Sequence, residues 1–295
     1  MVIWEMKLRY LGVSIAAFAG AGVFKILPLG AASSLGGRVA RFVGPHLRRH
    51  EIARKNFHRA LPDRSEAVAR RALTEMWDNF GRTIAEFVHL AEFDRLMGDR
   101  DSLMEFDGLD RLKRLRKDHR SAIFISGHMG NWELAPSMVR HAGFETVVIY
   151  HPFHEPYVDR LARKCRGAIN PRLMANKGRG KELVAALRDD LSPCMLVDQK
   201  PRRGPMMEFF GHDAKTETTP AKLALRYGVP IVPIRVQRLK GVHFKITAYP
   251  PIDTTGIENG ESGVAAITAA INKLLEGWIR ERPADWHWVH RRWPD

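Results

Sequence analysis

The sequence predicts an α/β fold in which a mostly parallel β-sheet is flanked by helices. Short apolar runs typical of buried strands alternate along the chain with segments whose apolar residues recur at helical spacing. No internal repeat or long linker interrupts this alternation. Such a pattern indicates helices packed on the faces of one sheet, where chemistry tends to lie at the carboxyl ends of the strands.

The first elements lie between residues 65 and 150. Residues 65–93 place apolar side chains on one helical face. Residues 121–126 form a short apolar run that ends at Gly127, which is typical of a buried strand. A helix over residues 131–141 follows, with Gly143 as its stop signal, and residues 146–150 are the next strand candidate.

The alternation continues to the end of the chain. The spacing of the apolar residues predicts three further helices, over residues 180–191, 220–227 and 264–279. Short apolar runs predict three further strands, over residues 194–197, 231–236 and 244–249.

Composition and charge limit the class of protein. The 295 residues are 45% hydrophobic and 27% charged, which favours a folded globular chain over a disordered one. The net charge is 47 − 33 = +14, so nucleic acid, anionic lipid or an acidic protein is the expected kind of partner. Cys165 and Cys194 allow one disulfide at most, which excludes a disulfide scaffold, and we expect both thiols to be reduced.

An apolar N-terminal segment indicates membrane attachment. Leu11 to Phe24 contains no charged residue, and Lys25 after it can snorkel along its stem. Dense cations follow between Arg38 and Arg59, and such flanking cations tend to stay cytoplasmic. We therefore expect residues 1–37 to form a hydrophobic membrane-anchoring helix, spanning or interfacial, and residues 38–295 a cytoplasmic domain. A cleaved signal peptide and a buried core helix are the alternatives.

The segment Ser-Gly-His-Met-Gly-Asn-Trp-Glu-Leu, residues 126–134, carries the candidate chemistry. His128 follows a predicted strand across a glycine turn, and Glu133 lies five residues later in the first turn of a helix. The Glu133 carboxylate can fold back on the imidazole, which would fix its tautomer and raise the basicity of the other ring nitrogen. This is the base half of a catalytic triad without a serine, so the nucleophile would be a substrate hydroxyl. The glycines and the helix N-terminus offer backbone N–H groups for an oxyanion.

Two other interpretations of this segment compete with the catalytic one. A histidine five residues before a glutamate is a short and common pattern, so a structural histidine at a strand-to-helix turn is the first alternative. A metal site is disfavoured, because the segment is not H-E-x-x-H and no second His or Cys stands at ligand spacing.

The frame around His128 and Glu133 resembles the H-x4-D/E motif of glycerolipid-type acyltransferases. It is most similar to the lipid A biosynthesis late acyltransferases, the lauroyl and myristoyl transferases of Gram-negative bacteria. Four further blocks resemble this family in the same order, so that the resemblance runs over nearly the whole chain. These blocks are W-x-N-x-G-R-x3-E from Trp77 to Glu86, D-Q…G…F-F-G from Asp198 to Gly211, Thr219 to Pro233, and the tryptophan-rich block from Trp286 to Trp293.

This resemblance implies roles and substrates. His128 would be the general base with Glu133 as its partner, acting on a hydroxyl of a Kdo-lipid IVA type lipid A precursor. The donor would be an acyl-acyl carrier protein, whose thioester needs no metal or other cofactor. The resemblance also implies a glycerolipid-acyltransferase-like fold and a bacterial inner-membrane protein facing the cytoplasm. The E-G-T-R block of many glycerolipid acyltransferases is absent, which favours the lipid A-like branch over a glycerol-phosphate acceptor.

Polar residues near the predicted strand ends are candidate substrate contacts. They are Asn131, Arg166, Asp198, Gln199, Arg202 and Arg203. The arginines and Gln199 can bind phosphate or carboxylate groups of the acceptor, while a solvated basic loop is the alternative for Arg202 and Arg203. Asn131 is equally suited to cap a helix, and Asp198 to orient a neighbouring group.

Other functions remain open beside acyl transfer to a lipid A precursor. Within the same class, the acceptor would be another glycolipid or lysolipid, such as a phosphatidylinositol mannoside. A nucleic-acid-binding protein is disfavoured, because the cations are spread and no helix-turn-helix, RRM or KH signature is present. A peripheral protein that only binds anionic lipid would have no need for a histidine opposite a glutamate.

Overall fold

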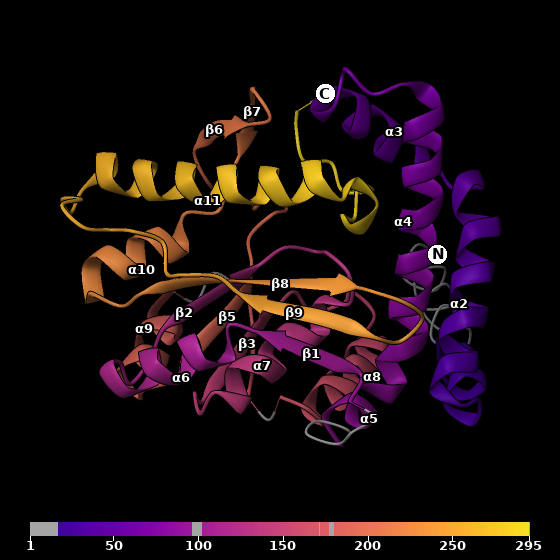
Figure 1. Cartoon of the computed structure of the whole chain (residues 1–295), viewed down its shortest axis with the longest axis horizontal. Helices are drawn as coiled ribbons and strands as arrows, with labels where there is room; N and C mark the ends of the chain where they lie inside the picture. Colours follow the sequence, from indigo (N-terminus) through magenta and orange to yellow (C-terminus); the bar gives the residue numbers. More distant parts are fainter. Residues whose placement is uncertain (1–16, 96–101, 171, 177–179, 295) are drawn as a thin grey trace, which may run out of the picture.

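A seven-stranded sheet forms the centre of the computed structural model, which describes residues 17–95, 102–170, 172–176 and 180–294. The strand order is β1-β9-β8-β2-β5-β3-β4 (Figure 1). The strands are β1 (Met104–Asp107), β2 (Ile123–Ser126), β3 (Thr146–Tyr150), β4 (Leu173–Ala175), β5 (Ser192–Leu196), β8 (Ile231–Arg238) and β9 (Phe244–Ala248). Every neighbouring pair is parallel except β8 with β9, which confirms the predicted mostly parallel sheet. A separate antiparallel hairpin consists of β6 (Met206–Phe209) and β7 (His212–Lys215).

Helices cover both faces of the sheet. They are α2 (Leu29–Val43), α3 (Arg48–Ala60), α4 (Glu66–Glu86), α5 (Leu90–Arg95), α6 (Leu109–Asp118), α7 (Ala135–His141), α8 (Pro156–Gly167), α9 (Gly180–Arg188), α10 (Thr219–Tyr227) and α11 (Glu261–Glu281). Short 3-10 turns are η1 (Gly44–His46), η2 (Phe87–His89), η3 (Trp132–Leu134) and η4 (Pro283–Asp285). In Figure 1, α11 and the β6–β7 hairpin lie on one side of the sheet, and α6, α7 and α8 lie on the other.

The central strand β2 has a continuously apolar sequence because both of its faces are buried. Ile123 and Ile125 pack in the hydrophobic cluster that contains residues of α11, whereas Phe124 between them packs in the cluster that contains residues of α7. All three side chains are at most 2% exposed. A strand buried on both faces has no polar side to alternate with, so its sequence is an unbroken apolar run.

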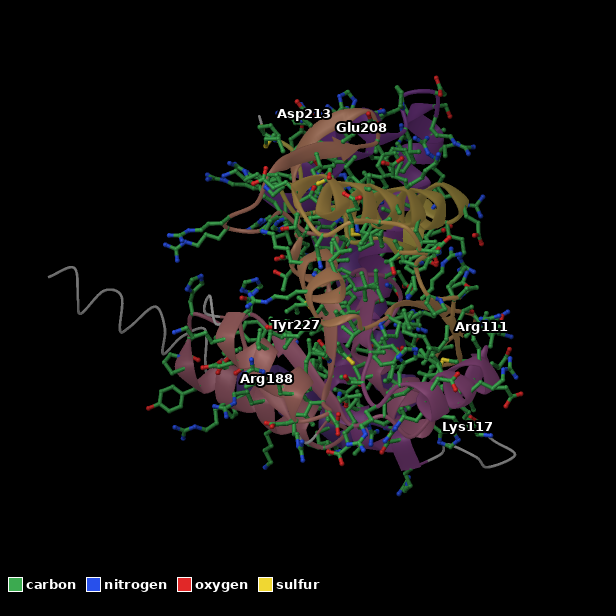
Figure 2. All side chains as sticks on the ribbon, turned by 90° about the vertical axis from the view of Figure 1, so that its left-hand side faces the viewer. Arg111, Lys117, Arg188, Glu208, Asp213 and Tyr227 are labelled. Atoms are coloured by element: carbon green, nitrogen blue, oxygen red, sulfur yellow. The ribbon has the colours of Figure 1, made fainter. Side chains whose placement is uncertain are left out.

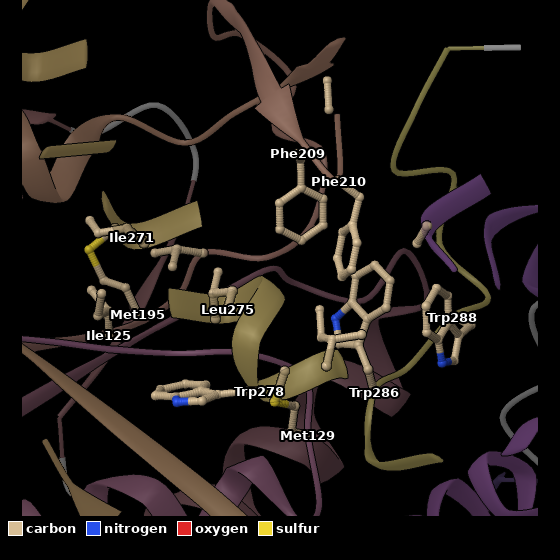
Figure 3. Packing of buried hydrophobic residues seen from close by; sticks show 14 of the residues in the cluster. Ile125, Met129, Met195, Phe209, Phe210, Ile271, Leu275, Trp278, Trp286 and Trp288 are labelled. Atoms are coloured by element: carbon tan, nitrogen blue, oxygen red, sulfur yellow. The ribbon is translucent and has the colours of Figure 1, made fainter. Parts of the chain in front are cut away.

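The tryptophan-rich C-terminus belongs to the core. Trp286, Trp288 and Trp293 are at most 3% exposed, and the rings of Trp286 and Trp293 contact the buried Phe209. Figure 3 shows Trp286 and Trp288 in the core with Phe209 and Phe210. Their rings meet edge-on or stacked, with centroids 4.6 to 6.4 Å apart. These five aromatic side chains therefore hold the chain end and the β6–β7 hairpin onto the domain.

The chain is part of the domain from α2 onward. Helices α2 and α4 lie side by side (Figure 1), and a Cβ added at Gly36 would come within 2.4 Å of the Gly81 carbonyl oxygen. This approach is possible only with glycine, and α2 runs through the expected boundary at residues 37 and 38. No helix in the described part of the chain is long and apolar enough to cross a membrane, so the expected membrane-anchoring helix is not found there. Residues 1–16 of that expected anchor lie outside the described residues.

Candidate active site

His128 and Asp198 meet at the carboxyl ends of two adjacent parallel strands. In the register of β2 and β5, Ser126 is paired with Leu196, and each functional residue lies two positions beyond its strand. His128 Nδ1 is 2.8 Å from Asp198 Oδ1, and the His128 backbone N–H donates to Oδ2 at 2.9 Å. The imidazole partner is therefore Asp198, which corrects the expectation that Glu133 would fill this role.

Asp198 is held as a buried, ionised carboxylate. Its side chain is 0% exposed, and besides the two bonds from His128 it accepts one from Trp286 Nε1 at 2.7 Å. Burial alone would raise the pKa of Asp198, but the charge of His128 and these hydrogen bonds hold it well below its ordinary value. The carboxylate thus fixes a proton on Nδ1 and leaves Nε2 as the basic nitrogen.

Glu133 pairs with Arg166 instead of His128. The Arg166 guanidinium donates from Nε at 2.8 Å and from Nη2 at 2.6 Å to the two carboxylate oxygens. The physical reason is geometric: a guanidinium offers two parallel donors that match a carboxylate, whereas an imidazole offers one. Burial lowers the pKa of Arg166, but the bonds to Glu133 and its charge outweigh burial and keep that pKa above its ordinary value. Nη1 is buried without a hydrogen-bond partner among the described residues.

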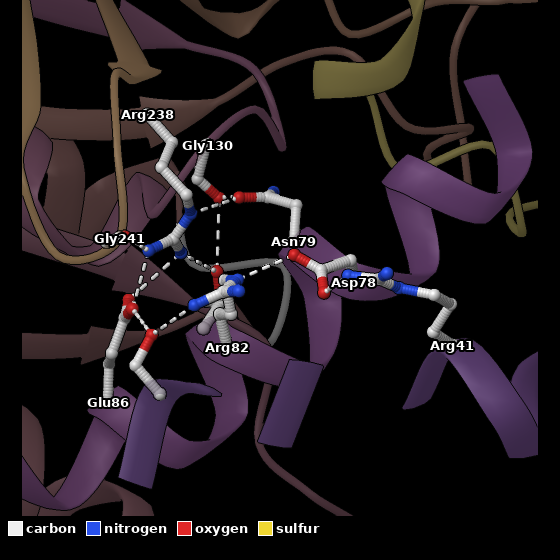
Figure 4. Close-up of polar contacts among 10 residues, drawn as sticks. Arg41, Asp78, Asn79, Arg82, Glu86, Gly130, Arg238 and Gly241 are labelled. Carbon is white, nitrogen blue, oxygen red and sulfur yellow. Dashed lines mark hydrogen bonds and ion pairs between the residues drawn. The ribbon is translucent and has the colours of Figure 1, made fainter. Parts of the chain in front are cut away.

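The loop after His128 is fixed from beneath by α4 (Figure 4). Asn79 Nδ2 and Thr83 Oγ1 both donate to the carbonyl oxygen of Gly130, at 3.0 and 3.2 Å. Gly130 has a φ of +55°, and a Cβ there would lie 2.6 Å from the Val236 carbonyl oxygen, so only glycine fits. The turn that carries His128 is therefore built into the packing of α4 against β8.

A buried ion pair supports the same loop. The Glu86 side chain is 0% exposed and accepts hydrogen bonds from Arg238 Nη1 at 2.5 Å and from Arg238 Nη2 at 3.0 Å (Figure 4). It also accepts one from Ser33 Oγ at 2.7 Å. Asn131 Nδ2 donates to the second Glu86 oxygen at 2.9 Å. Asn131 is 0% exposed and makes no side-chain cap bond to η3, so it holds the loop rather than meeting substrate or capping the helix.

The backbone donors expected for an oxyanion are already used. The N–H groups of Met129 and Gly130 donate to the carbonyl oxygens of Gly127 and Asp285, at 2.8 and 3.4 Å. The His128 N–H is bound to Asp198. The expectation that the glycine turn itself provides oxyanion donors is therefore wrong for residues 128–130.

A cavity of about 1080 Å³ opens in front of His128. Its rim is polar and cationic, and its lining there includes Arg166, Gln199, Lys200, Arg202, Arg203 and His290. The apolar part of its lining lies on the α7 face of the sheet and includes Phe124, Ala135, Val139, Val148, Cys194 and Ile234. The cavity therefore joins a site for an anionic group to a site for an apolar chain, with the His128 ring on its wall.

Most of the expected substrate contacts line this cavity. Gln199, Arg202, Arg203 and Arg166 do so, while Asp198 lies behind His128 and Asn131 beneath the loop. Arg202 and Arg203 are exposed at the rim. The structure therefore assigns Asp198 and Asn131 supporting contacts in place of the substrate contacts expected for them.

Sequence reasoning missed three side chains next to His128. The Trp132 ring lies 5.1 Å from the imidazole, centroid to centroid, and its Nε1 donates to Glu133 at 3.2 Å. His290 lines the cavity, and its Nε2 accepts from the Lys200 N–H at 3.1 Å. His287 stacks on Phe80 at 4.5 Å, and burial lowers its pKa to about 3. The position of His287 and His290 between tryptophans in the C-terminal block was the sequence feature that could have indicated these two histidines.

Three observations bear on other chemistry. In the part of the chain that the structure describes, no group of three or more His, Cys, Asp and Glu side chains is arranged to hold a metal ion. Basic side chains are distributed over several elements, including Arg111 and Lys117 of α6 and Arg188 of α9, rather than gathered on one helix (Figure 2). Burial raises the pKa of the Cys194 thiol to about 12, so this cavity residue is no nucleophile at neutral pH.

The sequence is similar over most of its length to bacterial acyltransferases of lipids. The family model described as "Bacterial lipid A biosynthesis acyltransferase" matches residues 4–295. The phosphatidylinositol mannoside acyltransferase of Mycobacterium tuberculosis is 27% identical over 264 residues, 86% of this chain and 78% of that protein. The lipid A biosynthesis palmitoleoyltransferase of Escherichia coli is 24% identical over 271 residues, 90% and 86% of the two chains. The lauroyltransferase of the same organism is 24% identical over 256 residues, 83% and 79% of the two chains.

Proposed function

Because the chain belongs to the bacterial lipid A biosynthesis acyltransferase family, we propose that it transfers a fatty acyl chain from an acyl-carrier-protein thioester to a hydroxyl of an anionic glycolipid. The acceptor of first choice is a lipid A precursor of the Kdo-lipid IVA type. The observation that carries this proposal is the buried Asp198 carboxylate behind His128, on the wall of a cavity with a cationic rim and apolar depths.

The chemistry follows from the two ring nitrogens. Asp198 keeps the proton on Nδ1, so Nε2 can accept the proton of the acceptor hydroxyl as its oxygen attacks the thioester carbonyl. Collapse of the tetrahedral intermediate breaks the carbon–sulfur bond, and the thiolate takes the proton back from Nε2. The products are an ester and a free thiol, and His128 returns to its starting state.

The apolar walls suit the acyl chain. Phe124, Val139 and Ile234 come from β2, α7 and β8, and are at most 2% exposed. Burying a chain against such walls is favourable by about 0.8 kcal/mol per methylene, so the depth of the cavity can select chain length. A volume of about 1080 Å³ lies at the upper end for ligand pockets, which leaves room for part of the acceptor.

The cationic rim suits a phosphate- or carboxylate-bearing acceptor. Arg202 and Arg203 are exposed there, and Arg166 Nη1 is a buried donor with no partner among the described residues. Such donors bind anionic oxygens strongly where water is scarce. We assign Arg166 to acceptor binding, with Glu133 holding its guanidinium in place.

A phosphatidylinositol mannoside is the second candidate acceptor. The specific observation in its favour is the 27% identity to the mycobacterial acyltransferase, against 24% for the two Escherichia coli enzymes. Both acceptors present hydroxyls beside anionic phosphate, so the same rim and the same base would serve either.

Apolar side chains exposed near the N-terminus support contact with the cytoplasmic face of the inner membrane. Ile26 is 86% exposed and Phe42 77% exposed, with Phe18 and Val39 about half exposed. The cation Arg38 lies on the same stretch of chain, as does Arg41, whose guanidinium is paired with Asp78. Attraction of about 1 kcal/mol per cation to an anionic leaflet would add to burial of these side chains, so vesicle binding should weaken as salt rises.

Mass spectrometry of total lipid from cells with and without this gene product tests the function. We expect one lipid class to lose one ester-linked acyl chain when the protein is absent, and its headgroup identifies the acceptor. An unchanged lipid profile, together with no acyl transfer by the purified protein to either candidate acceptor, would contradict the proposal.

A further inference from the structure

Trp286 is the one donor to Asp198 that comes from outside the catalytic loop, among the residues that the structure describes. Its indole Nε1 donates to Oδ2 at 2.7 Å, and the same oxygen accepts the His128 N–H at 2.9 Å. Oδ1 is then left to face His128 Nδ1 at 2.8 Å. Two donors on one oxygen therefore set the rotation of the carboxylate.

The chain around Trp286 also binds the loop that carries the histidine. The His287 N–H donates to the His128 carbonyl at 3.0 Å, and the Gly130 N–H donates to the Asp285 carbonyl at 3.4 Å. Met129 and Trp286 form an antiparallel β-bridge between these bonds. Residues 285–287 thus hold the loop by its backbone and Asp198 by a side chain.

This segment is itself anchored. The Trp286 ring meets Trp288 edge-on at 4.6 Å and Phe209 at 6.0 Å. Asn56 Nδ2 of α3 donates to the carbonyl oxygens of Trp288 and His290, at 2.8 and 2.6 Å. A donor held by rigid packing loses little freedom in making its bond, which is what a positioning group requires.

We propose that Trp286 is a positioning residue for the catalytic base, and that residues 285–287 act as a clamp that aligns Asp198 with His128. This role rests on the proposed acyl transfer. An indole N–H only donates, so it orients the carboxylate without competing for the proton that passes through the imidazole.

The neighbouring tryptophans show that this is more than packing. Trp288 and Trp293 are as deeply buried as Trp286, but their Nε1 groups donate to the backbone carbonyls of Pro283 and Phe209. The three rings share one cluster, and the indole of Trp286 is the one that reaches the catalytic carboxylate. Trp293→Phe is therefore a matched control, since it removes one buried indole hydrogen bond, to the Phe209 carbonyl, away from residues 285–287.

The test compares Trp286→Phe with Trp293→Phe in the full chain. Phe keeps most of the ring and loses the N–H. We expect Trp286→Phe to lower kcat roughly 10- to 100-fold with KM for the acyl donor nearly unchanged, because a hydrogen bond to a charged group is lost. Trp293→Phe should leave kcat within about threefold of wild type. In an Asp198→Asn background the two tryptophan variants should no longer differ in kcat.

The pH profile gives a readout that a structural role would not move. Without the indole donor, the negative charge of Asp198 attracts a proton on the imidazole more strongly. The acid limb of the profile of kcat against pH should therefore move to higher pH, by about half a pH unit or more. Neither variant replaces a titratable or charged group near the His128 imidazole. Asp198 is bonded to that ring, His287 and His290 interact with it electrostatically, and Glu133 and Arg166 line the same cavity. A shift in both variants, or in neither, would overturn the proposal.

A spectroscopic measurement separates this inference from the proposed function. In histidine-labelled protein the Nδ1–H proton of His128, identified by its loss in His128→Ala, should be shifted or broadened by Trp286→Phe alone. This signal needs no substrate, so it tests the clamp even if both candidate acceptors are wrong. An identical signal in wild type and Trp286→Phe would refute the positioning role.

Discussion

Replacement of Asp198 by Asn separates the pair that the structure shows, His128 with Asp198, from the pair that the H-x4-E spacing suggests. The change is nearly isosteric, but the amide has one acceptor oxygen where the carboxylate accepts three hydrogen bonds. If its oxygen takes the place of Oδ2 and keeps the bonds from Trp286 and the His128 backbone, its NH2 group faces Nδ1. Nδ1 must then accept, the proton moves to Nε2, and the base is lost.

The expected magnitude is large. A comparable Asp→Asn change in a serine-protease triad, which also leaves the wrong tautomer, lowers kcat about 10⁴-fold. We expect a fall of about 10³- to 10⁴-fold in kcat for Asp198→Asn, because the side chain is 0% exposed and water cannot take its place. Glu133→Gln should act differently: it weakens the hold on Arg166 and raises KM for the acceptor more than it lowers kcat.

The assay is transfer of a labelled acyl chain from acyl-acyl carrier protein to the glycolipid, with kcat and KM measured for both variants. Circular dichroism and thermal unfolding establish that each remains folded. A kcat for Asp198→Asn within tenfold of wild type would refute the assignment. So would a larger loss of kcat in Glu133→Gln than in Asp198→Asn, which would restore Glu133 as the partner of the histidine.

Three further predictions concern stability and specificity. Burial lowers the pKa of His287 to about 3, so the unfolded chain binds a proton that the folded chain does not, and the free energy of unfolding should fall by up to about 1.4 kcal/mol per pH unit from about pH 6.5 to pH 3. Urea unfolding of His287→Phe should show a flatter dependence in this range, and an unchanged slope would contradict the burial argument. Glu86→Ala should lower the free energy of unfolding, measured with urea, by roughly 3–5 kcal/mol, because it leaves Arg238 buried without its ion-pair partner. The control Glu75→Ala breaks an exposed pair with Arg71 and should lower it by less than about 1 kcal/mol. Equal losses in the two variants would contradict this prediction. Val139→Phe, on the apolar wall of the cavity, should shift the preferred donor toward shorter acyl chains in a competition assay, and an unshifted preference would place the chain elsewhere.

The strongly periodic segments could be predicted from the sequence. Residues 146–150 were expected as a strand and form β3, and the helix expected over 264–279 lies within α11 (Glu261–Glu281). The helix expected over 65–93 is divided, because α4 ends at Glu86 and a 3-10 turn precedes α5. Helices α3 and α6 were not among the expected elements; both are rich in cations, and Leu112 is the buried side chain of α6.

The sequence singled out His128 as the candidate base, but it did not identify the side chain that contacts its imidazole. Glu133 is close to His128 in sequence, and short spacing favoured it. Asp198 lies 70 residues away, and its contact depends on β2 and β5 being neighbours in register. Both strands were expected, each ending just before a functional residue, so the strand order was the missing information. Glu133 does not bond His128 because its two carboxylate oxygens accept two parallel hydrogen bonds from Arg166.

The N-terminus illustrates a different limit. An uncharged run predicts burial in some apolar environment but does not say which one. In the described part, α2 buries small residues such as Gly36 against α4 and turns Val39 and Phe42 outward. One helix therefore serves the protein core on one face and presents apolar side chains on the other.

The most direct test of the central claim is the product formed by purified wild type and His128→Ala from the same acyl donor and glycolipid. Mass spectrometry should show an acceptor heavier by one ester-linked acyl chain with wild type. His128→Ala, folded and at the same concentration, should form it at least about 10³-fold more slowly, since both the base and the partner of Asp198 are gone. Product formation by His128→Ala at a rate near that of wild type would contradict the claim that this histidine is the base.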